Sequence, residues 1–273
     1  MISDRSPPQW LDRVAAKSRT IIRGSVVWSI AAFLVLPTLL VIGMSLSSES
    51  YIQFPPREVS TRWYIAYLAD PQWMAATALS LKIAFGVMVM STLIGTMASV
   101  AFVRGCLPGA ELIRLLSLSP MITPSIVTAV AIYLTFSPIG LTDNYFGFVI
   151  AHTVLALPYV VLVITASLTT FDVDIELAAL NCGASRFRAF FEVVLPNIAP
   201  GVMSAAVFSF LTSFDEATVA IFIAGAHQQT LPSKLFEDIN STLTPIIPAV
   251  SATMVVVSLI LMGLLVAVRA RMR

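Results

Sequence analysis

Charged residues and cysteines are scarce in this sequence. Asp, Glu, Lys and Arg make up 11% of its 273 residues, whereas they make up ~25% of a typical soluble globular chain. That shortage excludes a water-soluble enzyme domain and a disordered chain. Two widely spaced cysteines, Cys106 and Cys182, fit neither a disulfide framework nor a metal-binding pattern. The net charge of +1 excludes the basic surface that DNA and RNA binding require.

Catalytic motifs are missing as well. No Gly-x-x-x-x-Gly-Lys-Ser/Thr phosphate loop occurs, so the chain cannot hydrolyse ATP by itself. No Gly-x-Ser-x-Gly nucleophile elbow occurs, which argues against an intramembrane serine hydrolase. His152 has no second His, Cys or acid three or four residues away, so no metal site is expected around it. We therefore expect a protein that is not an enzyme.

Apolar stretches dominate instead. Hydrophobic residues make up 58% of the chain, and the mean hydropathy is +0.89. About 20 mostly apolar residues suffice for one membrane-spanning helix. Six stretches meet this length, namely Val26–Leu46, Met74–Val103, Leu112–Phe136, Tyr145–Leu168, Ile198–Ile223 and Ile246–Val268. We therefore predict an all-α integral membrane protein with a six-span domain over residues 26–268, in which Pro120 and Pro124 kink the third span.

Lys and Arg are distributed unevenly between the connecting segments. Twelve of the sixteen fall on the side of the N-terminus if the spans alternate, three fall on the other side, and Lys82 lies within the second span. Cytoplasmic segments carry the excess of positive charge. Both termini, including the basic tail 269–273, are therefore predicted to be cytoplasmic. On the opposite side, Tyr67 and Trp73 are typical of the headgroup layer.

The N-terminal segment 1–25 precedes the first span and is mostly polar. Its apolar residues, among them Trp10 and Val14, recur at helical spacing with Arg13 and Lys17 between them. This pattern predicts a helix that lies in the inner membrane interface, with a disordered basic tail as the alternative. The segment has no apolar h-region, so the first span is interpreted as uncleaved.

Ionisable residues inside the predicted spans are candidates for a translocation pathway, because such charges usually face a partner or a water-filled cavity. They are Lys82, His152, Asp215 and Glu216. Helix rise places Lys82, His152 and Asp215 at one depth, about 10–12 Å below the outer surface. Either an acid attracts a cationic substrate, or Lys82 neutralises an acid across a helix contact. Since adjacent residues point ~100° apart on a helix, we expect one acid in each role. His152 is interpreted as a hydrogen-bonded packing residue.

The connection between the fourth and fifth spans, residues 169–197, is unusually long and carries helix signals of its own. Two aspartates near its start favour the beginning of a helix. Gly183 allows a sharp turn between two short helices. Together with Ala178 and Ala179 it gives a small-residue face suited to a groove on another protein. Pro196 is expected to stop the second helix and start the fifth span.

This loop resembles the EAA loop of the permease subunits of ATP-binding-cassette importers. The motif is a pair of small residues, three residues, Gly, nine residues, and then aliphatic-x-Leu-Pro. The matching residues are Ala178, Ala179, Gly183, Val193, Leu195 and Pro196. Leu177 stands where the motif carries its acid, and Glu176 precedes it, so the carboxylate is turned by ~100°. The resemblance implies a type I ABC importer permease fold. It also implies a set of residues that couple the spans to an ATPase, which are Glu176, Ala178, Ala179, Gly183, Leu195 and Pro196.

Within that family the sequence is most similar to polyamine-type permeases. The similar blocks are Phe54-Pro55-Pro56, Trp63-Tyr64, Ser213-Phe214-Asp215-Glu216 and Thr230-Leu231-Pro232. The resemblance implies import of a polyamine such as spermidine or putrescine. The charges inside the predicted spans make Asp215, Glu216 and Lys82 the candidates for its pathway. Permeases for phosphonate, iron, thiamine or an amino-acid-like compound share some of these blocks and stay open as alternatives. A secondary transporter is a further alternative, but it would leave the loop 169–197 without a function.

The resemblance also implies the partners of the chain. Such permeases work in pairs with a cytoplasmic dimer of ABC ATPases, which bind the ATP, and with an external solute-binding protein. Polyamine-type systems usually combine two different permeases, so we expect a heterodimer in the bilayer of a bacterial inner membrane. No cofactor, metal or nucleic acid is expected. Movement of the ATPases would reach the spans through the EAA helices as rigid-body motion, which gives alternating access.

Overall fold

The structure, a computed structural model, describes residues 9–105, 109–225 and 228–271, and only the backbone of residues 9–22. Its elements in chain order are α1 (Gln9–Ser45), α2 (Arg62–Ala69), α3 (Pro71–Arg104), α4 (Ala110–Ile122), α5 (Ser125–Phe136), the 3-10 turn η1 (Ser137–Ile139), α6 (Tyr145–Thr170), α7 (Val173–Asn181), α8 (Arg186–Ala189), the π-helix η2 (Phe190–Val194), α9 (Leu195–Phe214), α10 (Thr218–Ile223), α11 (Leu231–Ser241) and α12 (Ile246–Arg271). Cys106 and the ends of the predicted terminal segments, residues 1–8 and 272–273, lie outside this description.

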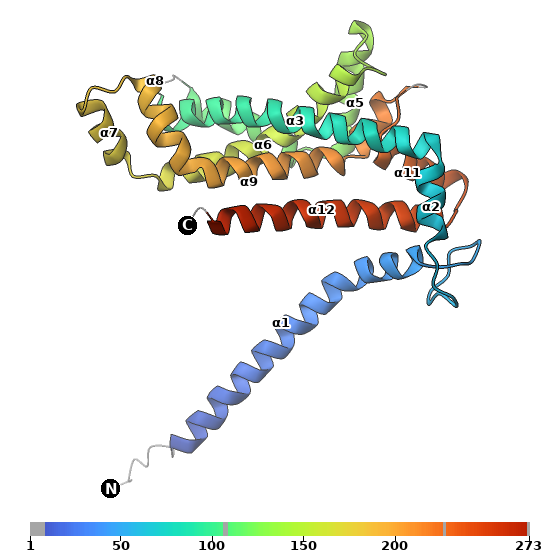
Figure 1. Cartoon of the computed structure of the whole chain (residues 1–273). Helices are drawn as coiled ribbons and strands as arrows, with labels where there is room; N and C mark the ends of the chain where they lie inside the picture. The colour runs from blue at the N-terminus through green and yellow to red at the C-terminus, as the bar shows by residue number, and fades with distance from the viewer. Residues whose placement is uncertain (1–8, 106–108, 226–227, 272–273) are drawn as a thin grey trace.

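Four long helices run roughly along one direction and give the molecule two ends (Figure 1). The helices α3, α6 and α9 pack against one another, and α12 lies beside α9. We call the end that carries α7, α8 and the last turn of α12 the α7 end. The opposite end, with α2 and α11, is the α11 end. Helix α1 leaves the bundle at the α11 end and runs back at an angle, so that it begins on the side of the α7 end (Figure 1).

The all-α membrane fold that the sequence predicts is confirmed. The described residues contain five helices that are long and apolar enough to cross a membrane, or six if the bent pair α4–α5 is one span. Small residues bring the helices together, as is usual in membranes. A side chain at Gly95 of α3 would clash with Val160 of α6. One turn further on, the Ser99 hydroxyl donates a hydrogen bond to the Val161 carbonyl at 3.3 Å.

The N-terminal helix differs from the prediction. Residues 9–24 are helical, but they continue into the first span without a break, so that α1 is a single helix of 37 residues. The apolar part of this helix, within Arg23–Ser45, has no buried residue. A separate interfacial helix needs a turn before the span. The described part of the chain has no such turn there, since Gly24 continues the helix.

The third and fifth predicted spans are interrupted. Helices α4 and α5 meet at an angle of 108°, which is far sharper than a proline kink within one helix. Thr123 is extended there, with ψ of 136°, because the ring of Pro124 disfavours a helical conformation in the residue before it. The predicted fifth span, Ile198–Ile223, ends as α9 at Phe214 and resumes as the short helix α10.

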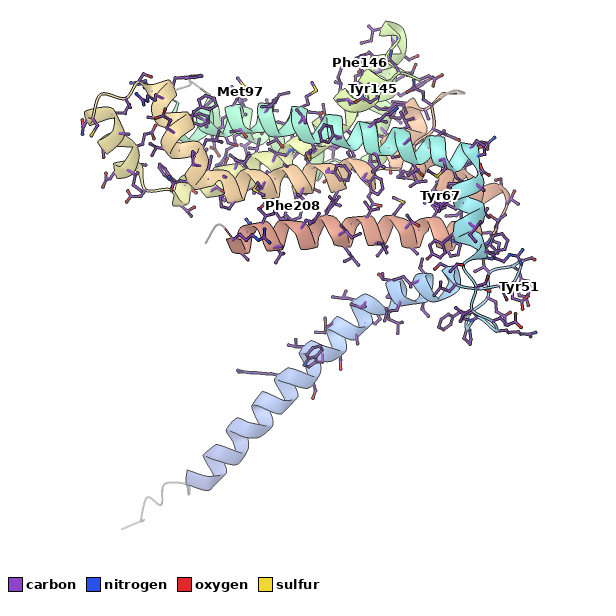
Figure 2. All side chains as sticks on the ribbon, viewed as in Figure 1. Tyr51, Tyr67, Met97, Tyr145, Phe146 and Phe208 are labelled. Carbon is purple, nitrogen blue, oxygen red and sulfur yellow. The ribbon has the colours of Figure 1, made fainter. Side chains whose placement is uncertain are left out.

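Two aromatic residues predicted for the headgroup layer belong to the core at the α11 end. Tyr67 and Trp73 are 2% and 3% exposed, and their rings meet edge to face. Tyr67 lies on α2, where this helix meets the bundle, whereas Met97 lies on α3 near the α7 end (Figure 2). The ammonium of Lys234 on α11 lies 4.7 Å from the centre of the Trp73 ring. These contacts fasten α2, α3 and α11 together.

Candidate functional site

The loop between α6 and α9 forms one short helix, α7, at the α7 end, as its signals predict, and the second predicted helix begins there as α8. The carboxylate of Asp172 accepts a hydrogen bond from the Asp174 N–H at 3.0 Å and caps the start of α7. The hydroxyl of Ser185 caps α8 in the same way, accepting from the Arg188 N–H at 3.2 Å. No residue of α7 is buried. The first helix of the loop therefore stands exposed at the α7 end (Figure 1).

Gly183 ends α7 in the left-handed region, with φ of +89°. Its N–H donates to the Leu180 carbonyl at 3.0 Å, and the Ala184 N–H donates to the Ala179 carbonyl at 3.1 Å. This pair of bonds is a Schellman motif, in which glycine is the residue without a steric cost. A Cβ at this position would meet nothing within 4 Å. The glycine is required by the backbone, and the space around it is open.

Pro196 does not stop the second helix of the loop. The elements α8, η2 and α9 follow one another directly and form one apolar helix from Arg186 to Phe214. Proline removes a backbone donor from a helix, and the wider turn of the π-helix η2 precedes it here. The Asn197 side chain donates to the Val193 carbonyl at 2.7 Å. Leu195 packs in the core between α6 and α9, so the end of the motif belongs to the fifth span.

The acid of the loop, Glu176, points toward the bundle. Its carboxylate forms an ion pair with Arg104, the last residue of α3. The Arg104 guanidinium also lies over the ring of Phe171, 5.7 Å from its centre. Leu177, at the position where the motif carries its acid, is 48% exposed. Sequence reasoning missed Arg104 because it lies far from the loop in the chain. Opposite charges at two predicted helix ends on one side of the membrane were the available signal.

The acid pair lies in the break between α9 and α10. Glu216 accepts a hydrogen bond from the Val219 N–H at 2.9 Å through Oε1, so its carboxylate serves the first turn of α10. Asp215 is exposed. Its carboxylate lines a hollow of about 490 Å³ between α9, α11 and α12, together with Ser251 and Met254. The two adjacent acids therefore have different surroundings.

Lys82 does not pair with either acid. The ion pairs of the residues that the structure describes do not include it, and its side chain is exposed. The Tyr145 hydroxyl donates to the Lys82 carbonyl at 3.2 Å. Tyr145 stands seven residues before His152, so Lys82 lies about 10 Å further toward the α11 end than His152. The predicted common depth is wrong for Lys82, because α3 already begins at Pro71, whereas the residue of α6 level with Lys82 is its first, Tyr145.

His152 is a buried packing residue between α6 and α9. Its Nδ1 lies 3.0 Å from the Ser213 hydroxyl, and its ring meets that of Phe148 edge to face. The Nε2 atom is buried without a hydrogen-bond partner. Ser213 precedes Asp215 by two residues, so His152 and Asp215 do lie at a similar depth. Within the described ranges, no group of three His, Cys, Asp or Glu residues could hold a metal ion.

Asp143, which the sequence did not single out, joins the α11-end halves of the two interrupted spans. Its N–H donates to the Ile223 carbonyl at 2.8 Å, and its carboxylate accepts from the Gln228 N–H at 3.0 Å. A side chain at Gly225 would clash with Asp143. Helix α5 also packs against α10. The α5–α6 connection and the end of α10 therefore form one unit.

Comparison with known proteins places this arrangement among transport proteins. Residues 91–273 match the family described as "Binding-protein-dependent transport system inner membrane component". The chain is 28% identical over 247 residues to the spermidine/putrescine transport system permease protein PotC of Haemophilus influenzae, covering 90% of this chain and 96% of PotC. It is 31% identical over 199 residues to the putrescine transport system permease protein PotI of Escherichia coli K12, covering 70% and 71% of the two chains.

Solved structures with the same fold are more distant in sequence. A chain of a bacterial ABC transporter involved in the import of the acidic polysaccharide alginate superposes with a TM-score of 0.67 at 15% identity, covering 96% of this chain and 98% of its own. A chain of an amino acid ABC transporter crystallised with histidines gives a TM-score of 0.59 at 20% identity, covering 78% and 99%. At these identities the likeness concerns the fold alone.

Proposed function

The chain belongs to the family of binding-protein-dependent transport system inner membrane components, and from this premise we propose that it forms half of the translocation pathway for a polyamine such as spermidine or putrescine. It is a permease subunit of an ATP-binding-cassette importer, and such subunits have no ATPase site of their own. It is a multi-pass protein of the inner membrane. We further propose its substrate, the segment through which it couples to an ATPase, and its partner proteins.

The observation that carries the substrate is the similarity to PotC over nearly the full length of both chains, with PotI as a second polyamine permease. The surroundings of Asp215 support it. Among the described residues, Asp215 has no ion-pair partner. A carboxylate next to a membrane span attracts cations, and Asp215 lines a hollow at the end of α9. Phosphonate is an anion and is disfavoured by the same charge. Iron, thiamine and amino-acid-like compounds remain the alternative substrates.

The proposed contact with the cytoplasmic ATPase dimer is the loop of α7 and α8. Helix α7 has no buried residue, and the space beside Gly183 is open. Ala178 and Ala179 keep this face small, while Leu195 and Pro196 connect it to the fifth span. ATP would be bound by the partner ATPase, whose movement would turn α7 and the bundle as rigid bodies.

We assign the α7 end to the cytoplasm. Arginines gather at helix ends on this side, and cytoplasmic segments carry the excess of positive charge. They are Arg104, Arg114, Arg186, Arg188, Arg269 and Arg271. The assignment places the start of α1 and the end of α12 on the cytoplasmic side (Figure 1). The α11 end then faces the external solute-binding protein.

A second, different permease is the proposed partner within the membrane. The apolar part of α1 has no buried residue, and only 22% of the apolar window of α12 is buried. Lipid or another permease therefore has to cover these faces. The polyamine assignment favours two different permease chains over two copies of this one.

The test is uptake of labelled spermidine and putrescine by cells that contain the complete importer. We expect Asp215→Asn to raise the KM for polyamine about tenfold or more, as for loss of a hydrogen bond to a charged group. Glu216→Gln is the matched variant. Its amide oxygen can still accept from Val219, so a small change is expected. If both variants transport at the normal rate, neither acid is part of the pathway. If unlabelled phosphonate, iron, thiamine or an amino acid competes and polyamines do not, the substrate assignment is wrong.

A further inference from the structure

We propose that Arg104 and Glu176 are positioning residues that make α3 follow the movement of α7. The inference rests on the proposed function, because it concerns how movement of an ATPase at the α7 end reaches the bundle. It assigns the acid of the loop to a contact within this chain. The ATPase would then be met by the rest of the exposed surface of α7.

The first observation is how little else holds α7. None of its residues is buried. Its main packing contacts are with α8 and η2, which are the next parts of the same loop. A movement of α7 would therefore reach α9 along the chain through the π-helix. The Glu176–Arg104 ion pair adds a direct link to α3, a helix that is not its neighbour in sequence.

The second observation is the setting of the ion pair. The side chains of Arg104 and Glu176 are 21% and 15% exposed, and the guanidinium lies over the ring of Phe171, which directly follows α6. The pair thus joins the ends of α3, α6 and α7 at one point. Low exposure reduces screening by water and salt, and removal of one partner leaves the other charge without compensation.

Other ion pairs at the α7 end provide a contrast. Glu111–Arg114 and Arg188–Glu192 are pairs of residues three and four positions apart in the chain. Their side chains are 42% to 70% exposed. Pairs of this kind contribute little, and each of the two lies within one continuous helix. The Arg104–Glu176 pair is less exposed and connects two separate helices.

The third observation is the direction of the carboxylate. Glu176 stands one position before the usual acid of the motif, which turns it by ~100°, and the structure directs it to Arg104. Leu177, at the usual position, is 48% exposed. The side chain exposed to a partner at the usual position of the acid is therefore apolar, whereas the carboxylate of Glu176 pairs with a residue of this chain.

The experiment uses the complete importer in proteoliposomes, with the solute-binding protein and spermidine, and measures uptake and ATP hydrolysis separately. We expect Glu176→Gln and Arg104→Gln to lower uptake per ATP hydrolysed about tenfold, the scale of mutations that alter coupling, while the ATPase still copurifies. The exchanged pair Arg104→Glu with Glu176→Arg should restore most of the coupling. Glu111→Gln, which removes an exposed ion pair on α4, is the control and should leave it unchanged.

A second readout does not depend on the substrate. Spin labels on Val173→Cys, at the start of α7, and on Met97→Cys of α3, in a chain with Cys106→Ser and Cys182→Ser, report the distance between α7 and α3, since both sites are exposed. We expect ATP to leave this distance unchanged in the otherwise wild-type complex and to change it in Glu176→Gln. An unchanged distance in the variant, or single variants with normal uptake per ATP, would overturn the link. If the wild-type complex binds the ATPase and shows the label result but imports no polyamine, only the substrate assignment fails.

Discussion

The imidazole of His152 and the hydroxyl of Ser213 lie 3.0 Å apart in the buried contact between α6 and α9. We expect Ser213→Ala to lower the free energy of unfolding by about 1–3 kcal/mol, because it leaves a buried ring nitrogen without a partner. Denaturant unfolding of the purified chain in detergent measures this. Ser204→Ala is the matched control, since the Ser204 hydroxyl donates within its own helix, to the Pro200 carbonyl. If both variants lower the free energy of unfolding equally, the contact between His152 and Ser213 adds nothing to stability.

Gly183 has a positive φ and open space around it. A side chain at this position therefore strains the backbone but clashes with no atom of this chain among the described residues. We expect Gly183→Trp to abolish uptake while the chain still inserts in the membrane, because the indole would occupy the surface proposed for the ATPase. Copurification of the ATPase is the second measurement.

Gly140 provides the control for this substitution. It has φ of +69° and also has no atom within 4 Å of a Cβ, so Gly140→Trp carries a similar backbone cost of about 1 kcal/mol. Uptake should survive in that variant. Normal ATPase binding and uptake in Gly183→Trp would remove the coupling function from the loop.

Lys82 and Asp215 do not form an ion pair, so their substitutions should act independently. We expect the effects of Lys82→Met and Asp215→Asn on the free energy of unfolding to add within about 0.5 kcal/mol. A double-mutant cycle in detergent measures the difference. An interaction energy clearly above that limit would mean that Lys82 does neutralise Asp215.

Gly95 lies where α3 packs against α6, and a Cβ there would clash with Val160. We expect Gly95→Val to cost about 1–3 kcal/mol, since extra atoms at a tight contact force the helices apart. Gly263 on α12 offers the comparison, because a Cβ there meets nothing within 4 Å. Thermal unfolding of both valine variants tests the contact, and equal transition temperatures would contradict it.

Cys182 is exposed next to the turn of the loop and reports the orientation of the chain. In a Cys106→Ser background, a membrane-impermeant maleimide should label Cys182 in inside-out vesicles and leave it unlabelled in intact spheroplasts. Bound ATPase should protect it. Labelling in spheroplasts alone would place the α7 end outside and reverse the predicted topology.

Local features of the fold could be predicted from the sequence, and long-range ones could not. The spans follow from hydropathy, and the turn at Gly183 follows from a short segment of the chain. The pair of Arg104 with Glu176 depends on how α3 packs. The ties of Asp143 to the end of α10 depend on the packing of α5 and α10. No local pattern contains that information.

The interrupted helices show an intermediate case. Pro124 predicts a kink in the third span, but the size of the bend depends on what α5 packs against. The break after Phe214 falls at the acid pair Asp215-Glu216, inside a stretch whose length and mean hydropathy predict one span. It depends on two hydrogen bonds. Glu216 accepts one from the Val219 N–H, and the Asp143 N–H donates the other to the Ile223 carbonyl at the end of α10.

Helix α3 has 34 residues and is therefore about 51 Å long, whereas the hydrocarbon layer is only about 30 Å thick. Both of its ends are fastened, at Arg104 to α7 and at Trp73 beneath Lys234 of α11. A hydrogen-bonded helix hardly stretches along its axis. We therefore expect a displacement of an ångström or two at the α7 end of this helix to produce a displacement of similar size at its α11 end. The length of this one helix sets the distance between the contact with α7 and the contact with α11.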